Sequence, residues 1–183
     1  HKGGMALIYD VAYADGRAAP FPMVMKVPRM TAGDGAETIV SFEVEHQMMQ
    51  ALDGPHVPHL VAAGDLSVLP YLVMEYVPGR TLDLWLDQVN QGVLLAPETL
   101  AQLGAAVAHA AHSLHEQNAV HLDLKPANVI IKGDGTAVLL DFGLSFHAHY
   151  PDLLAEETRH AVGSPAYMSP EQVVGVRGDP RSD

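Results

Sequence analysis

The sequence contains no cysteine, so a disulfide framework and a thiolate metal site are both excluded. No apolar run approaches the roughly 18 residues of a membrane-spanning helix, and no signal peptide is recognisable. Basic residues are scarce, because 10 Lys and Arg stand against 22 Asp and Glu, for a formal net charge of −12. That charge argues against a nucleic-acid backbone as the main partner. We expect a cytoplasmic chain with no membrane segment in this stretch, while anchoring by a segment outside it stays open.

Apolar residues make up 48% of the 183 positions, enough to build a substantial core. Apolar and aromatic enrichment predicts two strands around an Asp15-Gly16 turn and a buried strand that Pro78-Gly79 ends. Between these strands, the spacing of apolar residues over 36–52 predicts a helix. A second helix is predicted to begin at Pro97. The expected elements are strands over 5–16, 20–28 and 69–79, and helices over 36–52 and 97–117. After residue 145 no sustained period is found, which predicts a long functional or mobile loop.

One carboxylate, Glu45, falls on the apolar side of the first expected helix. Phe42, Met49 and Leu52 share its stripe, because their spacings put them on a single helical face. A charge among core-facing apolar residues is costly unless a cation meets it. The sequence therefore predicts a cationic partner for Glu45.

The segment NVIIKGDGTAVLLDFG predicts a tight hairpin. Two strand-like runs, 129–132 and 137–140, flank what reads as a four-residue turn. The expected register sets Asn128 opposite Asp141, with Cα atoms about 4.5–5.5 Å apart. An amide oxygen and a carboxylate that converge there predict a hard-cation site of the kind that holds Mg²⁺.

The segment HLDLKPAN, residues 121–128, leads into this hairpin. Its Pro126 excludes an ordinary helix interior and favours a fixed loop. Asp123 can face the same site as Asn128 without being a metal ligand, which leaves it free to accept a proton. Lys125 adds a positive point charge suited to a phosphate oxygen. The segment therefore predicts a proton acceptor, a phosphate-binding cation and a metal ligand.

Together with DFG at 141–143, HLDLKPAN resembles the catalytic loop and metal-binding motif of eukaryotic-like protein kinases. GGMALIY resembles the second half of the family's glycine-rich loop, VMKV its lysine-bearing strand, LVMEYVPG its hinge, and GSPAYMSPE the end of its activation segment. These motifs are most similar to those of bacterial Hanks-type serine/threonine kinases, over essentially the whole chain. The resemblance implies an α+β, bilobal fold: a β-rich N-lobe with one helix (1–77) and a mainly helical, truncated C-lobe (78–183). Both ends of the chain look cut, so we expect a catalytic-domain fragment.

The resemblance also implies ATP- and Mg²⁺-dependent phosphorylation of Ser or Thr on protein substrates, with a kinase-domain dimer as an open question. Lys26 would pair the ATP phosphates and be held by Glu45, while Asp123 would orient the substrate hydroxyl and take its proton. Lys125 would meet the γ-phosphate, and Ser164 would support Asp123 and Lys125. The nucleotide-binding residues implied are Gly3, Gly4, Ile8, Val24, Lys26, Met74 as gatekeeper, Glu75, Val77 and Ile130, and the Mg²⁺ ligands implied are Asn128 and Asp141.

Three departures from the family pattern bear on activity. The first loop glycine falls at or before the first residue, and the third is Ala6, so the grip on phosphate is altered or the chain is cut. Leu122 replaces the arginine that usually pairs with a phosphorylated activation loop, so we predict that activity does not require phosphorylation of Thr158. The family continues into a helix beginning about Asp183 that braces the catalytic loop, and Glu171 lacks its usual arginine partner beyond it. The isolated 183 residues are therefore expected to be poorly stable or inactive.

Two other functions stay open. A pseudokinase scaffold would bind nucleotide without transfer, although the complete catalytic set argues against it. A small-molecule kinase of the aminoglycoside or choline type shares the H-x-D-x-x-x-x-N pattern, but Lys125 and the GSPAYMSPE segment argue against it. The 11 histidines do not predict a metal site, because no third ligand accompanies His147 and His149, or His112 and His115, at a sensible spacing.

Overall fold

The structure is a computed structural model of the chain and describes residues 6–29, 36–65, 68–92, 94–158 and 161–183. Within these ranges the helices are α1 (Ala36–Ala51), α2 (Leu82–Asn90), α3 (Pro97–Glu116), α4 (Leu153–Glu157) and α5 (Pro170–Val173), with 3₁₀ turns η1 (Pro126–Asn128) and η2 (Pro180–Ser182). The strands are β1 (Ala6–Val11), β2 (Met23–Pro28), β3 (Leu60–Ala63), β4 (Leu72–Glu75), β5 (Arg80–Thr81), β6 (Ala119–Val120), β7 (Val129–Ile131), β8 (Ala137–Leu139) and β9 (Phe146–His147).

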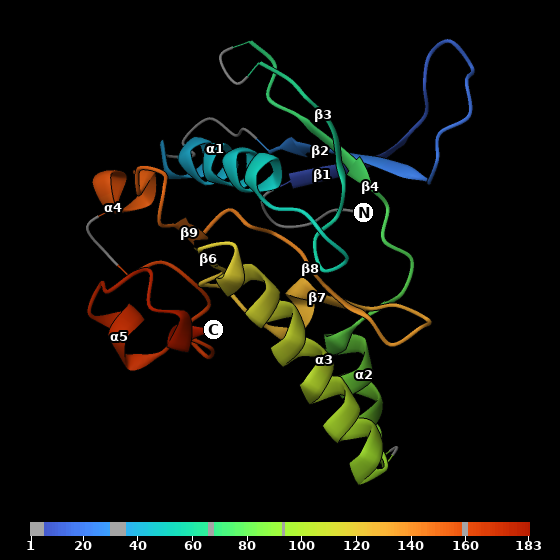
Figure 1. Cartoon of the computed structure of the whole chain (residues 1–183), viewed down its shortest axis with the longest axis vertical. Coiled ribbons are helices and arrows are strands. Elements are labelled where there is room, and N and C mark those ends of the chain that lie inside the picture. The colour runs from blue at the N-terminus through green and yellow to red at the C-terminus, as the bar shows by residue number, and fades with distance from the viewer. Residues whose placement is uncertain (1–5, 30–35, 66–67, 93, 159–160) are drawn as a thin grey trace.

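The molecule has two parts, as the resemblance implies. Strands β1 to β4 and helix α1 form the upper part in Figure 1, and helices α2, α3 and α5 form the lower part. The β7–β8 hairpin lies between the two. This is a β-rich lobe above a mainly helical lobe. In the described ranges, no helix is both long enough and apolar enough to cross a lipid bilayer.

The upper sheet is antiparallel, in the order β1–β2–β4–β3. Strands β1 and β2 are shorter than the expected strands, because the chain leaves the sheet after Val11 and rejoins it only at Met23. Gly16 lies within this connection with a φ of +74°, a conformation that glycine adopts at little cost. The predicted turn is therefore present, but it belongs to a long connection and not to a tight hairpin.

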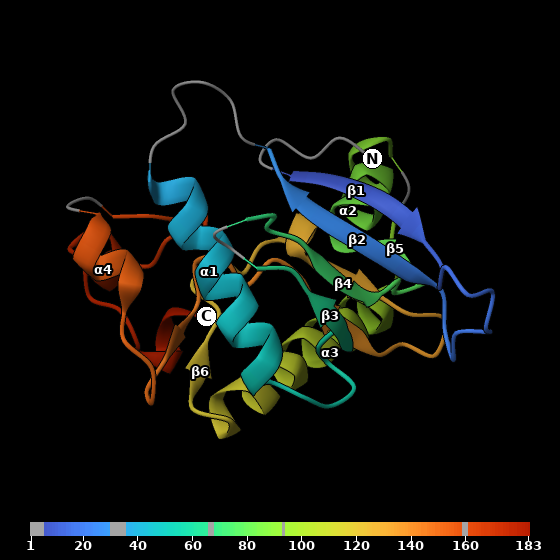
Figure 2. The same ribbon diagram turned by 90° about the horizontal axis from the view of Figure 1, so that it is seen from above.

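Helix α1 lies alongside the sheet (Figure 2). Its predicted stripe of Phe42, Met49 and Leu52 is buried, in one core cluster with Leu72 of β4. Glu45 is only 4% exposed on the same helix. The stripe thus places a carboxylate inside the molecule, as its spacing predicts.

The other elements agree with the sequence to different degrees. Helix α3 begins at Pro97, as predicted, and ends within one residue of its expected end. The strand expected over 69–79 is the shorter β4. Strands β3, β5, β6 and β9 and helix α2 have no counterpart among the expected elements, because most of them are too short to show a period.

The predicted register of the β7–β8 hairpin is wrong by one residue. The N–H of Leu140 donates to the carbonyl of Asn128 (2.8 Å), so Asn128 stands opposite Leu140 and not opposite Asp141. The cause is the turn, which spans the three residues 133–135. Gly135 adopts a φ of +87°, and a glycine with this conformation closes a three-residue hairpin loop.

The segment after residue 145 contains short elements that start from local caps. The Asp152 carboxylate accepts a hydrogen bond from the N–H of Ala155 at the start of α4 (3.2 Å). Ser169 and Gln172 form a reciprocal capping box at the start of α5. Helices of four or five residues are too short to show a repeating pattern of apolar residues, so the sequence did not predict them.

Candidate active site

A cavity of about 600 Å³ lies between the upper sheet and the β7–β8 hairpin. Its lining is mainly apolar, with the charged side chains of Lys26, Glu45 and Asp141 in one part of the wall. The predicted nucleotide-binding residues that line it are Ile8, Val24, Lys26, Met74, Glu75, Val77 and Ile130. Gly3 and Gly4, for which phosphate contacts are predicted, lie outside the described residues.

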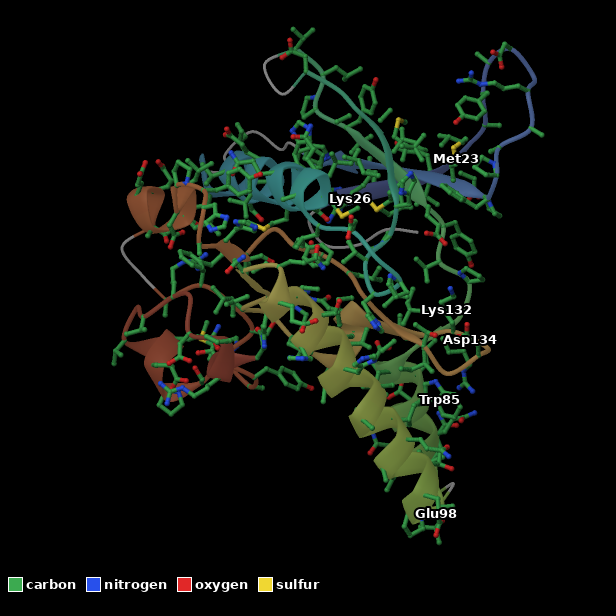
Figure 3. The ribbon with its side chains drawn as sticks, viewed as in Figure 1. Met23, Lys26, Trp85, Glu98, Lys132 and Asp134 are labelled. Atoms are coloured by element: carbon green, nitrogen blue, oxygen red, sulfur yellow. The ribbon has the colours of Figure 1, made fainter. Side chains whose placement is uncertain are left out.

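Lys26 of β2 is the cation that meets Glu45. Its ammonium lies 2.6 Å from a carboxylate oxygen of Glu45 and 2.9 Å from Oδ1 of Asp141. Burial alone would lower the pKa of Lys26, but the two carboxylates outweigh it and hold that pKa above its usual range. Burial raises the pKa of Glu45, and the Lys26 charge offsets part of the rise. Figure 3 shows Lys26 beside α1, away from Lys132 and Asp134 in the hairpin.

Asp141 reaches the cavity although it does not face Asn128 across the hairpin. Its φ of +65° is left-handed, a conformation that costs a non-glycine residue roughly 1–3 kcal/mol. Asn128 and Asp141 nevertheless both line the cavity. Burial opposes ionisation of Asp141, but the Lys26 ammonium keeps its pKa below the usual value. An ionised carboxylate and an amide oxygen on one wall are oxygen donors of the type that Mg²⁺ takes, so these residues fit the ion.

Asp123 is buried and held by three donors. Its Oδ2 accepts from the ammonium of Lys125 (2.6 Å) and the amide of Asn128 (3.1 Å), and its Oδ1 accepts from the N–H of Ser164 (3.0 Å). Lys125 also donates to the hydroxyl of Ser164 (2.7 Å). The contact of Ser164 with both residues is as expected, whereas the Asn128–Asp123 bond was not predicted from the sequence. Because Asn128 gives its amino group to Asp123, its amide oxygen is the atom left for a cation.

The backbone just before Asp123 is fixed by Asp183. Its two carboxylate oxygens accept from the N–H groups of His121 and Leu122, both at 2.8 Å. The side-chain amide of Gln172 donates to the carbonyl of Leu122 (2.8 Å), so Leu122 is held in a left-handed conformation with a φ of +61°. The resemblance implied that the start of a helix beginning about Asp183 braces this loop, and here the Asp183 carboxylate itself makes the contact. The role of Gln172 was missed, because its only sequence signal is the capping pattern of α5.

The remaining candidates make no hydrogen bond with Asp123. Glu171 accepts a hydrogen bond from the hydroxyl of Ser182 (3.1 Å). His112 lies 3.6 Å from Glu116, and His115 pairs with Asp183. Over the part of the chain that the structure describes, no three His, Cys, Asp or Glu side chains gather as metal ligands.

Comparison with known proteins identifies the fold family. The protein kinase domain family matches residues 18–183. The chain is 35% identical over 175 residues to the serine/threonine-protein kinase AfsK of Streptomyces coelicolor, covering 96% of this chain and 21% of that protein. It is 32% identical over 184 residues to the serine/threonine-protein kinase PrkC of Bacillus subtilis, covering 99% of this chain and 27% of that protein. The chain thus spans only 21% to 27% of the length of these curated relatives. From this match and the geometry above, we conclude that the chain belongs to the protein kinase domain family, among the bacterial serine/threonine kinases of the Hanks type.

Proposed function

We propose that the protein transfers the γ-phosphoryl group of ATP, with Mg²⁺, to Ser or Thr hydroxyl groups of protein substrates. The observation that carries the proposal is the setting of Asp123. Three donors fix its carboxylate, and two of them, Lys125 and Asn128, also line the cavity that contains the Lys26–Glu45 pair. A carboxylate fixed next to such a cavity is placed to orient a hydroxyl and take its proton.

In this proposal each charged group has one task. Asp123 accepts the proton of the attacking hydroxyl as the new P–O bond forms, while the bond from the γ-phosphorus to the β,γ-bridging oxygen breaks and ADP leaves. Lys26 neutralises charge on the nucleotide phosphates, and Glu45 keeps its ammonium in place. Lys125 neutralises charge on the transferred phosphoryl group. Phosphoryl transfer depends mainly on such positioning and charge stabilisation.

The nucleotide base would occupy the apolar part of the cavity. Ile8, Val24 and Ile130 would contact its two faces, and Met74, which is 9% exposed, would limit how deeply it enters. The N–H of Glu75 already donates to the carbonyl of His59 (2.9 Å). The carbonyl of Glu75 and the backbone of Val77 would therefore be the groups that meet the purine edge.

Asn128 and Asp141 would hold Mg²⁺ through their oxygens. The ion, when bound, would offset the negative charge of the phosphates. The lobes would divide at about residue 77. A location in the cytoplasm would give the enzyme access to ATP, and the lack of cysteine is compatible with it. A kinase-domain dimer stays a hypothesis that sedimentation at several concentrations would test.

The test is an autophosphorylation and substrate assay with γ-labelled ATP on the full-length protein. Asp123→Asn should reduce transfer on the order of 10²–10⁴-fold, because orientation and proton transfer are both lost. Asp15→Asn, at an exposed carboxylate in the β1–β2 connection, is the matched control and should have no effect.

Two outcomes would favour the rival functions. Nucleotide binding by the wild-type protein without transfer to any acceptor would indicate a pseudokinase. Label on an aminoglycoside or choline, and none on protein, would indicate a small-molecule kinase.

A further inference from the structure

Arg177, in the segment after α5, binds two other parts of the chain at once. Its Nε donates to Oδ2 of Asp152 (2.8 Å), and its Nη2 donates to the carbonyls of Leu144 (3.0 Å) and Ser145 (3.3 Å). The Arg177 side chain is 12% exposed and that of Asp152 is 20% exposed. A planar guanidinium can reach several acceptors in this way, whereas a lysine ammonium is a compact point charge. Arg177 therefore joins its own segment to the backbone just after Asp141 and to the start of α4.

The Asp152 carboxylate connects Arg177 to α4, because it binds both. While Oδ2 binds the arginine, Oδ1 caps the helix by accepting from the N–H of Ala155 (3.2 Å). Leu154 of α4 is 1% exposed and belongs to the same core cluster as Phe42 and Met48 of α1. Helix α4 packs against α1, and Figures 1 and 2 both place the two helices side by side.

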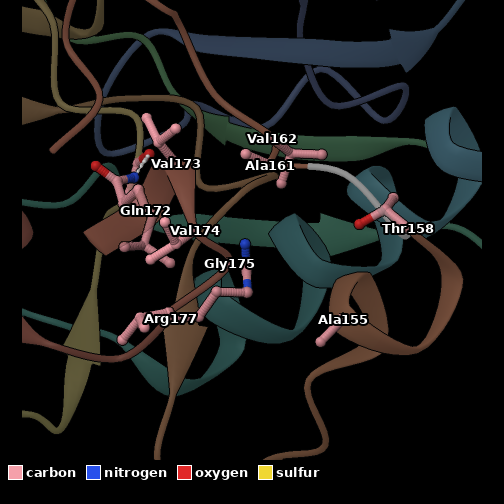
Figure 4. Close-up of a pocket in the computed structure, with 11 residues that line it drawn as sticks. Ala155, Thr158, Ala161, Val162, Gln172, Val173, Val174, Gly175 and Arg177 are labelled. Atoms are coloured by element: carbon pink, nitrogen blue, oxygen red, sulfur yellow. Dashed lines mark hydrogen bonds between the residues drawn. The ribbon is translucent and has the colours of Figure 1, made fainter. Parts of the chain in front are cut away.

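Packing alone gives α4 little support on its other side. Ala155, Thr158 and Arg177 lie around a cavity of about 270 Å³ that also borders Leu122 (Figure 4). A helix of five residues is far too short to be stable by itself. Leu153 and Leu154 hold α4 to the core, and the Arg177–Asp152 ion pair holds it to the segment after α5.

We propose that Arg177 is a positioning residue for phosphoryl transfer: its contacts with Asp152 and with the backbone after Asp141 hold α4 against α1, and so keep Glu45 at Lys26. The inference rests on the proposed function. Since Asp152 supplies the negative charge, the restraint is permanent and needs no phosphate on the activation segment. It gives α4 a charged restraint in a chain that carries Leu122 where the family has an arginine.

The experiment compares Arg177→Gln, Arg177→Lys, Asp152→Asn and the Arg177→Gln/Asp152→Asn double variant in the full-length protein. Arg177→Gln should lower kcat about 10-fold to 10²-fold, the scale of a misplaced catalytic group. Arg177→Lys should lower kcat less than Arg177→Gln does, because lysine keeps the positive charge but lacks the planar set of N–H donors of the guanidinium. The double variant should be no worse than Arg177→Gln, because both changes remove the same ion pair.

Hydrogen exchange gives a readout that a purely local role would not change. Amides of α1 as well as α4 should exchange faster in Arg177→Gln and Asp152→Asn, because the restraint extends to α1. Arg181→Gln is the matched control: Arg181 also pairs with an aspartate, Asp179 at 2.6 Å, but is 86% exposed. It should change neither activity nor exchange in α1.

Three results would overturn the inference: wild-type activity in Arg177→Gln, increased activity in it, or faster exchange confined to α4. If Arg177→Gln does not fold, Asp152→Asn decides, because asparagine keeps the helix cap and removes only the charge. A different result would show that the proposed function is wrong while the structural role of Arg177 is right. In that case the wild-type protein would transfer no phosphate to protein, while exchange in α1 would still respond to Arg177→Gln.

Discussion

The ammonium of Lys26 donates to Oδ1 of Asp141 at 2.9 Å, across 115 residues of sequence. The same ammonium binds Glu45, so a cation from the upper sheet joins a carboxylate of α1 to one beside the hairpin. Opposite charges at these distances in a partly buried site interact more strongly than they would in water. The two parts of the molecule are therefore held together at the point where phosphate would bind.

Removal of the Lys26 charge should make stability depend on pH in a specific direction. In Lys26→Met, Glu45 stays buried without its cation, and removal of one partner of a buried pair costs about 3–5 kcal/mol. Burial already raises the pKa of Glu45, and loss of Lys26 raises it further. The folded state then binds the proton more tightly than the unfolded state, so stability falls as pH rises above the usual glutamate pKa.

Urea unfolding of Lys26→Met at pH 5 and at pH 7 would measure this effect. The variant should be closer to wild-type stability at pH 5. Lys132→Met in the hairpin is the control and should show no such difference. A Lys26→Met variant with equal stability losses at both values would contradict the prediction.

His121 should make the protein sensitive to acid. It is fully buried, and burial lowers its pKa below 6.5. Its Nε2–H donates to the carbonyl of Leu140 (3.0 Å), and its Nδ1 accepts from the N–H of Asp123 (3.3 Å), so the neutral ring satisfies both partners. The unfolded state takes up the proton first. Stability is therefore complete above about pH 6.5 and is lost as pH falls below it, by up to about 1.4 kcal/mol per pH unit.

The measurement is the free energy of unfolding between pH 7.5 and 5.5 for the wild type and His121→Gln. Subtraction of the two slopes isolates His121 from the other histidines. Equal slopes would show that this ring does not titrate on unfolding.

Phosphorylation of Thr158 should weaken the activation segment. The Thr158 hydroxyl donates to the carbonyl of Leu154 (2.7 Å), which caps the last turn of α4. A phosphate would remove that donor and add negative charge at a helix C-terminus, a loss of about 1–2 kcal/mol in the stability of α4. Phosphatase treatment should therefore leave activity intact, and Thr158→Glu should lower it. Loss of all activity after phosphatase treatment, with recovery in Thr158→Glu, would reverse this conclusion.

Two glycines should respond in opposite ways to alanine. A Cβ at Gly79, whose φ is +156°, would lie 2.5 Å from the carbonyl oxygen of Ile131, so Gly79→Ala should destabilise by about 1–3 kcal/mol. Gly104 lies inside α3 with open space around it, so Gly104→Ala should stabilise by about 0.5–1 kcal/mol. Thermal unfolding of both variants gives the comparison, and shifts of the same sign would disprove it.

The sequence predicted the parts of the fold that depend on local chemistry. The stripe of α1 and the start of α3 at Pro97 are visible in residue order, since burial and proline geometry leave short-range patterns. A cationic partner for Glu45 was also predictable, because a carboxylate on an apolar stripe needs a cation. That Lys26 is this cation was implied by the resemblance to the kinase family, and the structure pairs the two. The short strands could not be predicted, because their pairing partners are distant in sequence. Helices α4 and α5 have local caps but are too short to show an apolar period.

The sequence alone determined which chemical groups the site contains, because those groups are side chains in a fixed order. Only the tertiary structure decided how they meet. The hairpin turn closes over three residues, so Asn128 and Asp141 do not face each other across the strands. Both residues line the same cavity, and the backbone of Asp141 is left-handed. The contact of Arg177 with Asp152 likewise depends on how two loops pack. Packing between distant segments is a property of the whole folded chain, and no local pattern of residues encodes it.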